Sequence, residues 1–145
     1  MAVSGSIDFD IKASPEKVMA ALVDVESLPK WSSSHRKVEV RSRDEQGRPQ
    51  RVWMAISTLG INDEQLVDYR FTDTTVEWSL VEPSNQQKTQ DGSYVLAPSD
   101  AGTRLTFELT VDLKIPMPGF LVKRGQKMAL ETASKGLKKF VEEQA

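Results

Sequence analysis

The sequence predicts an α+β fold in which a curved antiparallel sheet of about seven strands wraps around one long C-terminal helix. The first observation is that most of the chain alternates apolar and polar residues, in short segments separated by turn residues. The second is that the last segment, from Gly119 to about Glu143, repeats its apolar residues at helical spacing. With 145 residues, of which 39% are hydrophobic, the chain suits a single domain over residues 1–145.

The chain opens with a strand followed by short helical elements. Residues 3–12 alternate apolar and polar side chains, which is the period of a half-buried strand. Ser14 and Pro15 then predict a helix that runs to about Val23, because serine caps helix N-termini and proline suits the first turn. Pro29 interrupts the next segment, so we expect a broken turn of helix there, with Trp31 as its anchor.

The region from His35 to Asp112 is predicted to form about six strands, because turn residues recur in it at short intervals. Its strands place apolar residues on one face and polar residues on the other. Such a sheet has one side in solvent and one side that must be covered. In the two clearest stretches the apolar face holds Val76, Trp78, Leu80, Leu105, Phe107, Leu109 and Val111.

A stiff corner, "KIPMPG", joins the last strand to the C-terminal helix. Pro116 and Pro118 keep the residues before them extended, and Gly119 is expected to let the chain turn sharply into the helix. A helix of this length spans nearly 40 Å, at a rise of about 1.5 Å per residue. Held at a fixed angle, it is expected to touch the curved sheet in some places and to stand off in others, which leaves a hydrophobic cavity.

Composition excludes several classes of function. The net charge of −2 and the absence of a basic stripe argue against nucleic acid as a partner. There is no cysteine and one histidine, and the carboxylates have no ligand spacing, so we expect no metal and no cofactor. The start of the chain lacks a signal-peptide pattern, and no apolar run approaches the roughly 20 residues of a membrane span. We therefore expect a cytoplasmic protein.

Four stretches carry a resemblance to a known family: "IDFDIKASPEKVMAALVDVESLPKW", "VEWSLVE", "DGSYVL" and "LTVDLKIPMPGFLVKR". Together with the order of elements, they resemble the START-like superfamily, also called Bet v 1-like or SRPBCC, whose architecture is the helix-grip fold. Within it, they are similar to the bacterial polyketide cyclase/dehydrase and lipid transport group. The resemblance covers essentially the whole chain and implies a hydrophobic pocket between the sheet and the C-terminal helix.

The predicted ligand-binding residues follow from the apolar faces of the strands and helix and from the implied pocket. Aromatic residues and methionines among them would give the pocket a large, adaptable apolar surface. The predicted set is Trp31, Met54, Ile56, Val76, Trp78, Leu80, Tyr94, Leu105, Phe107, Leu109, Met117, Phe120, Leu121 and Met128.

The candidate catalytic residues are Tyr94, Tyr69 and Arg70, because the resemblance implies that cyclases of this superfamily orient a polyketide with arginine and tyrosine. Tyr69 and Arg70 are neighbours on a strand, so at most one of them faces the pocket, and a surface ion pair is the favoured role for Arg70. Tyr94 is expected to pack in the core or to bind a ligand. His35 lacks a nearby partner and is expected at the surface or as a cap, and Glu64 is a further ionisable candidate.

Three functions fit these observations. The favoured hypothesis is a carrier that encloses a lipid, isoprenoid or polyketide without changing it. The alternatives are a polyketide cyclase or dehydratase that uses the same pocket, and a protein-binding domain without a ligand. Basic residues of the last helix suit either a solvated face or a transient contact with an anionic membrane or an acyl carrier protein. These residues are Lys123, Arg124, Lys127, Lys135, Lys138 and Lys139.

Overall fold

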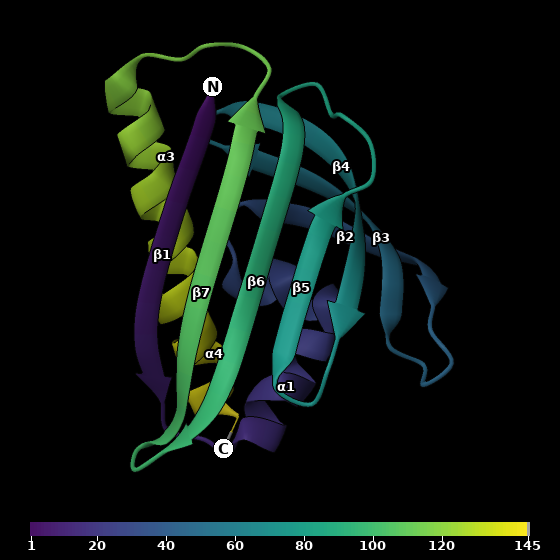
Figure 1. Ribbon diagram of the computed structural model, residues 1–145, viewed down its shortest axis with the longest axis vertical. Coiled ribbons are helices and arrows are strands. Elements are labelled where there is room, and N and C mark those ends of the chain that lie inside the picture. Colours follow the sequence, from purple (N-terminus) through teal and green to yellow (C-terminus); the bar gives the residue numbers. More distant parts are fainter. Residues whose placement is uncertain (145) are drawn as a thin grey trace.

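The computed structural model describes residues 1–144 and consists of one antiparallel sheet with its helices on the concave side (Figure 1). The predicted α+β helix-grip architecture is confirmed. In chain order the elements are β1 (Ala2–Ile11), α1 (Pro15–Val23), the short turn η1 (Val25–Ser27), α2 (Leu28–Trp31), β2 (His35–Arg43), β3 (Pro49–Thr58), β4 (Ile61–Phe71), β5 (Thr75–Leu80), β6 (Gln87–Ser99), β7 (Gly102–Leu113), α3 (Gly119–Glu131), η2 (Thr132–Gly136) and α4 (Leu137–Glu143).

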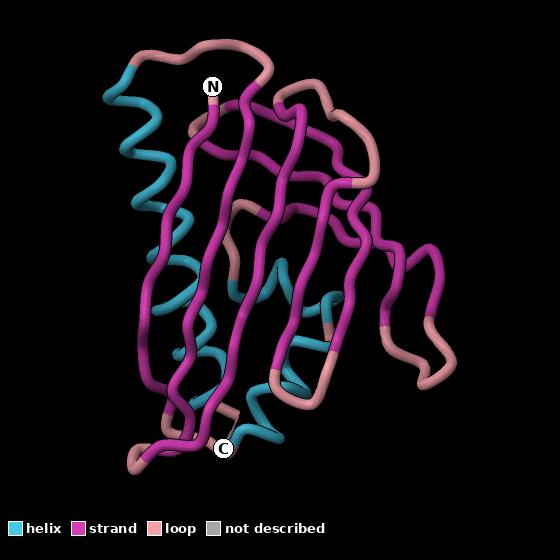
Figure 2. The backbone as a smooth tube through the Cα atoms, in the orientation of Figure 1, coloured by secondary structure: helices cyan, strands magenta, loops and turns pink. Residues whose placement is uncertain are grey.

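Strands β2 to β7 form a meander, and β1 pairs with the last strand of this meander, β7. Their order in the sheet is β1-β7-β6-β5-β4-β3-β2, and every pair of neighbours is antiparallel. The first strand therefore lies beside the last one, with Ala2 opposite Asp112 and Ile11 opposite Thr103 (Figure 2). Helix α3 lies along β1 (Figure 1). The Gln126 side-chain amide of this helix donates a hydrogen bond to the Ser4 carbonyl of the strand. The helix thus covers an edge strand that would otherwise be open.

The two faces of the sheet divide as the alternation predicts. On the solvent side, Arg104 pairs with Asp10 at 3.1 Å and Arg51 pairs with Asp68 at 2.9 Å. The concave side is apolar and packs against the helices. Ser14 caps α1 by accepting a hydrogen bond from the Lys17 N–H at 3.2 Å, as expected for a serine before a helix.

The C-terminal helix begins at Gly119 and ends at Glu143, as the apolar spacing predicts. Its first part, α3, has no buried residue, whereas the second part buries Ala133, Leu137 and Val141. The helix therefore buries side chains fully only in its second half, while Leu130 near the end of α3 packs against the core and stays partly buried. The first half stands beside the sheet without closing on it, which confirms the uneven contact expected from the sequence.

Pro118 stands directly before α3 at the end of the corner. Pro118 is the N-cap, with extended backbone at ψ 141°, and its carbonyl accepts hydrogen bonds from the N–H groups of Leu121 and Val122. Gly119 is the first helical residue and lies outside the left-handed region, so the expectation that glycine supplies the turn is wrong. The chain bends first at Lys114 and Ile115, and Pro118 is the last extended residue before the helix.

A single turn of π-helix, η2, fixes the point where the helix meets the sheet. In this turn the Leu137 N–H donates to the Ser134 carbonyl instead of to the carbonyl of Ala133. The buried Tyr94 hydroxyl, from β6, donates a hydrogen bond of 3.0 Å to the Ala133 carbonyl. Tyr94 thereby gains the partner that a buried phenol needs, and the helix is tied to the middle of the sheet.

Gly92 creates the space that the indole of Trp78 occupies. The two residues face each other across β5 and β6, and a methyl group added at Gly92 would overlap the Trp78 ring. The ring lies flat across the strand because residue 92 has no side chain.

We predict that Gly92→Ala destabilises the protein by about 1–3 kcal/mol, because the Trp78 ring must leave its position or the strands must separate. Urea unfolding followed by tryptophan fluorescence measures the change. Gly119→Ala is the matched control, since nothing lies within 4 Å of a methyl group there and the free energy of unfolding should not fall. Equal stability of the two variants would contradict the packing described.

Candidate ligand cavity

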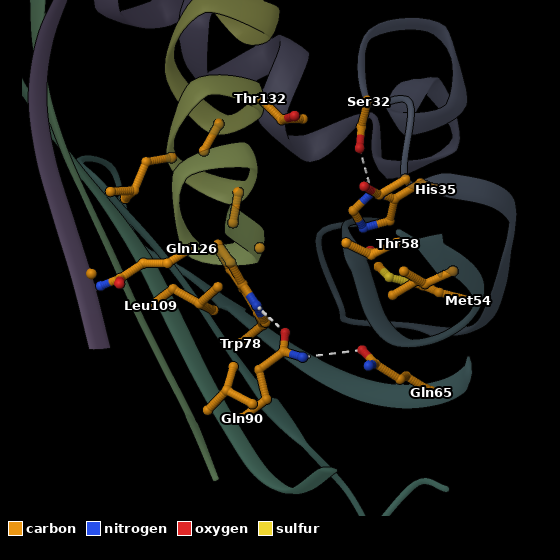
Figure 3. Close-up of a pocket in the computed structure, with 18 of the residues that line it drawn as sticks. Ser32, His35, Met54, Thr58, Gln65, Trp78, Gln90, Leu109, Gln126 and Thr132 are labelled. Atoms are coloured by element: carbon orange, nitrogen blue, oxygen red, sulfur yellow. Dashed lines mark hydrogen bonds between the residues drawn. The ribbon is translucent and has the colours of Figure 1, made fainter. Parts of the chain in front are cut away.

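A cavity of about 340 Å³ lies between α3 and the concave face of the sheet (Figure 3). All seven strands contribute to its wall, β2 through His35 at its start, and α1, α2 and the corner before α3 complete it. Its lining is mainly apolar. On the helix, the lining residues form a stripe of Leu121, Val122, Gly125, Gln126, Ala129, Leu130 and Ala133.

Most of the residues predicted to bind a ligand line this cavity. Their position follows from the period of two along the strands, because inward residues of neighbouring strands face the same space. Those that line it are Trp31, Met54, Ile56, Val76, Trp78, Tyr94, Phe107, Leu109, Met117 and Leu121. That they contact a ligand stays a prediction.

The structure places four of the predicted residues elsewhere. Leu105 is fully buried in the main core, and Leu80 packs against a second core cluster around Val52 and Val67. Phe120 has 70% of its surface exposed, and neither it nor Met128 belongs to the lining stripe of the helix. The apolar pattern identifies which residues point inward. It does not distinguish inward residues that pack in the core from those that border the cavity.

Aromatic rings form a continuous wall on one side of the cavity. The ring centre of Trp78 lies 5.8 Å from Tyr69, 5.9 Å from Tyr94 and 6.1 Å from Phe107. Tyr94 and Phe107 are 5.0 Å apart. Such tilted contacts are favourable and keep the rings in place. The wall therefore offers a preformed apolar surface to a flat or flexible molecule.

Tyr69 and Arg70 point to opposite faces of β4, as predicted. Tyr69 lines the cavity, and burial raises the pKa of its hydroxyl above the usual range. Burial likewise raises the pKa of Tyr94. Both phenols therefore stay protonated at neutral pH, and Tyr94 donates a hydrogen bond to the Ala133 carbonyl. Arg70 is exposed and pairs with Glu77 on β5 at 3.6 Å, so it is not a cavity residue.

His35 lies on the cavity wall, which corrects the expectation of a surface or capping residue. Its Nδ1 is 2.6 Å from the buried Ser32 hydroxyl (Figure 3). Desolvation by burial lowers the pKa of His35 to about 4. The imidazole is therefore neutral at neutral pH, and it forms a hydrogen-bonding pair with Ser32.

A group of polar side chains, which we call the polar network, also borders the cavity. It consists of Asp63 and Gln65 on β4, Gln87 and Gln90 on β6, and Ser84 in the loop between β5 and β6. The Trp78 indole N–H donates to Gln90 at 3.0 Å, and the Gln90 amide donates to Gln65 at 3.0 Å (Figure 3). The Gln65 amide in turn donates to the carboxylate of Asp63, where the chain of bonds ends.

The polar network is absent from the sequence predictions, although its signal is present in the strand pattern. Counting back from Tyr69 in steps of two gives Val67, Gln65 and Asp63 as inward residues. Glu64, considered as a candidate, is exposed on the solvent side.

The two glutamines of β6 follow no simple alternation. Gln87 and Gln90 differ by an odd number of positions, yet both border the cavity, because the register of β6 shifts between Gln87 and Thr89. A shift of this kind has no local sequence signal, so only the structure brings both glutamines to the wall.

The described part of the chain contains neither a cluster of metal ligands nor a helix suited to span a membrane. No group of three or more histidine, cysteine or carboxylate residues could hold a metal ion within residues 1–144. Over the same residues, none of the helices has the length and apolar character that a bilayer crossing requires.

A family model described as "Polyketide cyclase / dehydrase and lipid transport" matches residues 11–138. A search of curated proteins gave no significant match.

Solved structures with the same fold come from several bacteria. A START superfamily protein from Mycobacterium smegmatis is 22% identical, with 99% of each chain covered and a TM-score of 0.84. The protein TTHA0849 from Thermus thermophilus is 26% identical, with 97% of each chain covered and a TM-score of 0.77. The Zhui aromatase/cyclase from Streptomyces sp. R1128 is 11% identical, covering 98% of this chain and 93% of that one, with a TM-score of 0.80.

We predict that His35 makes the protein less stable as the pH falls from about 7.5 to about 5. The unfolded state takes up the proton at the ordinary pKa of about 6.5, whereas the folded state takes it up only near 4. The contribution lost over this range is about 1–2 kcal/mol. Urea unfolding at both pH values measures the free energy of unfolding of the wild type and of His35→Gln. The carboxylates contribute to the pH dependence of both proteins, so the difference between them reports His35. The prediction would be contradicted if the wild type lost no more unfolding free energy over this pH range than the variant.

Proposed function

The chain belongs to the polyketide cyclase/dehydrase and lipid transport family, and on this premise we propose that it binds and carries a small hydrophobic molecule in the cavity beside α3. The observation that carries the proposal is the aromatic wall of Tyr69, Trp78, Tyr94 and Phe107 facing an open volume. A lipid, an isoprenoid and a polyketide are the ligand classes that such a wall suits.

The size and chemistry of the cavity support this proposal. Its volume of about 340 Å³ lies in the range of small-molecule sites. A ligand that buries about 300 Å² of apolar surface gains about 7 kcal/mol before the entropic cost of association is subtracted. Few polar contacts are then needed, and those present serve to orient the ligand.

The ionisable groups on the wall favour carriage over catalysis. The Tyr94 hydroxyl is occupied by the Ala133 carbonyl, Tyr69 stays protonated, and His35 is neutral and bonded to Ser32. No hydrogen bond joins any two of Tyr69, Tyr94 and His35 in the described chain. General acid–base catalysis needs groups within reach of the same reacting atoms, and a paired acid and base is its usual signature.

One observation favours the alternative function of a cyclase or dehydratase. Tyr69 lines the cavity and its hydroxyl makes no hydrogen bond to another described residue, so it is free to donate to a bound ketone. Under this alternative, pocket shape would select the folded conformer of a polyketide and Tyr69 would supply a proton or a hydrogen bond.

We predict that Tyr69→Phe retains ligand affinity to within about threefold, because the ring and its apolar contacts remain. Binding of a neutral fluorescent dye, phenylnaphthylamine, measures the affinity. Turnover of a linear poly-ketone by the wild type that disappears in Tyr69→Phe, with dye binding intact, would overturn the carrier proposal and support the cyclase.

The predictions of a membrane or acyl carrier protein as partner, and of a cytoplasmic location, stay predictions. The first is supported by the chemistry of the protein surface. Lys123, Arg124 and Lys127 belong to α3, which also carries the exposed Phe120, and the exposed Ile115 lies in the corner before this helix. This combination of charge and apolar surface supports a transient contact with an anionic membrane or an acyl carrier protein. A cytoplasmic location and a single-domain organisation are proposed with it.

We predict that Ala129→Phe abolishes binding without unfolding the protein, because residue 129 lines the cavity and the added ring fills it. Dye titration and native mass spectrometry of the purified protein measure occupancy, and the melting temperature should not fall. Ala97→Phe is the matched control, since Ala97 is exposed on the solvent side of β6 and the same change there should leave binding unaltered. Wild-type protein that retains no guest and binds no apolar dye would favour the protein-binding alternative.

A further inference from the structure

The polar network is a directed chain of donors that converges on one carboxylate. The Gln90 amide donates to Gln65 at 3.0 Å and to Gln87 at 2.7 Å. The Gln65 amide donates to Asp63 Oδ2 at 3.0 Å, and the Ser84 hydroxyl donates to the same oxygen at 2.6 Å. Two separate donors of the network therefore meet at one oxygen of Asp63.

The other carboxylate oxygen of Asp63 has no partner. Asp63 is only 8% exposed, and its Oδ1 is buried and makes no hydrogen bond in the described structure. No lysine, arginine or histidine of the described residues forms an ion pair with it. A buried acceptor without a donor costs free energy, and Asp63 borders the cavity, so a donor that enters the cavity and reaches Oδ1 after a small side-chain adjustment would remove this cost.

The donors of the network are directed away from Oδ1. Both hydrogens of the Gln90 amide are engaged by Gln65 and Gln87, and the Gln65 amide and the Ser84 hydroxyl are both bonded to Oδ2. The neighbouring residues thus hold the carboxylate in place and satisfy only one of its oxygens. Asp63 and the three glutamines all line the same cavity as the aromatic wall.

Resting on the proposed carrier function, we propose that the cavity selects an apolar ligand whose head is a hydrogen-bond donor, an alcohol or an amine, which meets Asp63. The apolar body lies against Trp78 and Tyr69, and the head reaches the polar network. A head that is only an acceptor, such as a carboxylate, is rejected, because it would place two acceptors together in a desolvated site.

The two donor heads share one chemistry and are separated by experiment. Dodecanol, dodecylamine and dodecanoate carry the same chain, and each is tested for displacement of phenylnaphthylamine from the protein at a pH of about 7.5, at concentrations below its solubility limit or, for the charged compounds, its micelle concentration. The wild type is expected to bind dodecanol and dodecylamine at least about tenfold more tightly than dodecanoate. A further preference for dodecylamine over dodecanol would identify a cationic head, and the reverse order a neutral one.

Asp63→Asn tests the residue itself, because it keeps the shape of the side chain and replaces an acceptor by a donor. It is expected to reduce the preference over dodecanoate by about tenfold, with an unchanged melting profile as the check of folding. Asp91→Asn is the matched control, since Asp91 is exposed on the solvent side of β6 and should leave the order unchanged.

The outcomes separate the two proposals. Dodecanoate that binds the wild type as tightly as the alcohol and the amine overturns the donor-head assignment but leaves the carrier function standing, and this comparison needs no variant. An unchanged order of affinity in folded Asp63→Asn also overturns the assignment. If none of the three compounds displaces the dye and the dye itself does not bind, both proposals fail.

Discussion

The hydrogen bond from Tyr94 to the Ala133 carbonyl is the contact that the arrangement of the cavity depends on. It joins the middle of the sheet to the C-terminal helix at the one turn where the helical bonding pattern changes. Beyond this point the helix buries Leu137 and Val141, and before it α3 buries nothing. The helix is also tied to the edge strand β1 by the hydrogen bond from Gln126 to the Ser4 carbonyl, and Pro118 sets its start, so it is held beside the sheet along its length. The open volume follows from these constraints together.

The same strands perform different tasks on their two faces. On the solvent side, Arg51 and Asp68 form a charged pair whose hydrogen bonds hold the pKa of the Asp68 carboxyl below its usual value. Exposed pairs of this kind add little stability. On the concave side of β4, by contrast, Asp63 is buried and faces the cavity without a cationic partner among the described residues. Because neighbouring residues of a strand alternate faces, one strand supplies both the surface pair and the wall of the site.

Much of this fold can be predicted from the sequence because its signals are local. The bounds of the C-terminal helix follow from apolar spacing, and the inward position of Tyr69 follows from a period of two. The lining is harder to predict, since Leu105 and Phe107 share one face yet only Phe107 borders the cavity. That difference depends on how far residues distant in the sequence cover each side chain, which no local pattern encodes. The place of His35 on the wall escapes prediction because its burial depends on the approach of α2, which no local pattern encodes.

Trp78 joins the apolar and polar parts of the site into one unit. Its ring contacts Tyr69, Tyr94 and Phe107, while its N–H holds Gln90 at the start of the chain that leads to Asp63. The ring can take this position only because residue 92 is glycine. A ligand pressed against the aromatic wall would therefore act on the same side chain that orients the polar network. Under the proposed function, recognition of the body and of the head of a ligand would be coupled through the indole of Trp78.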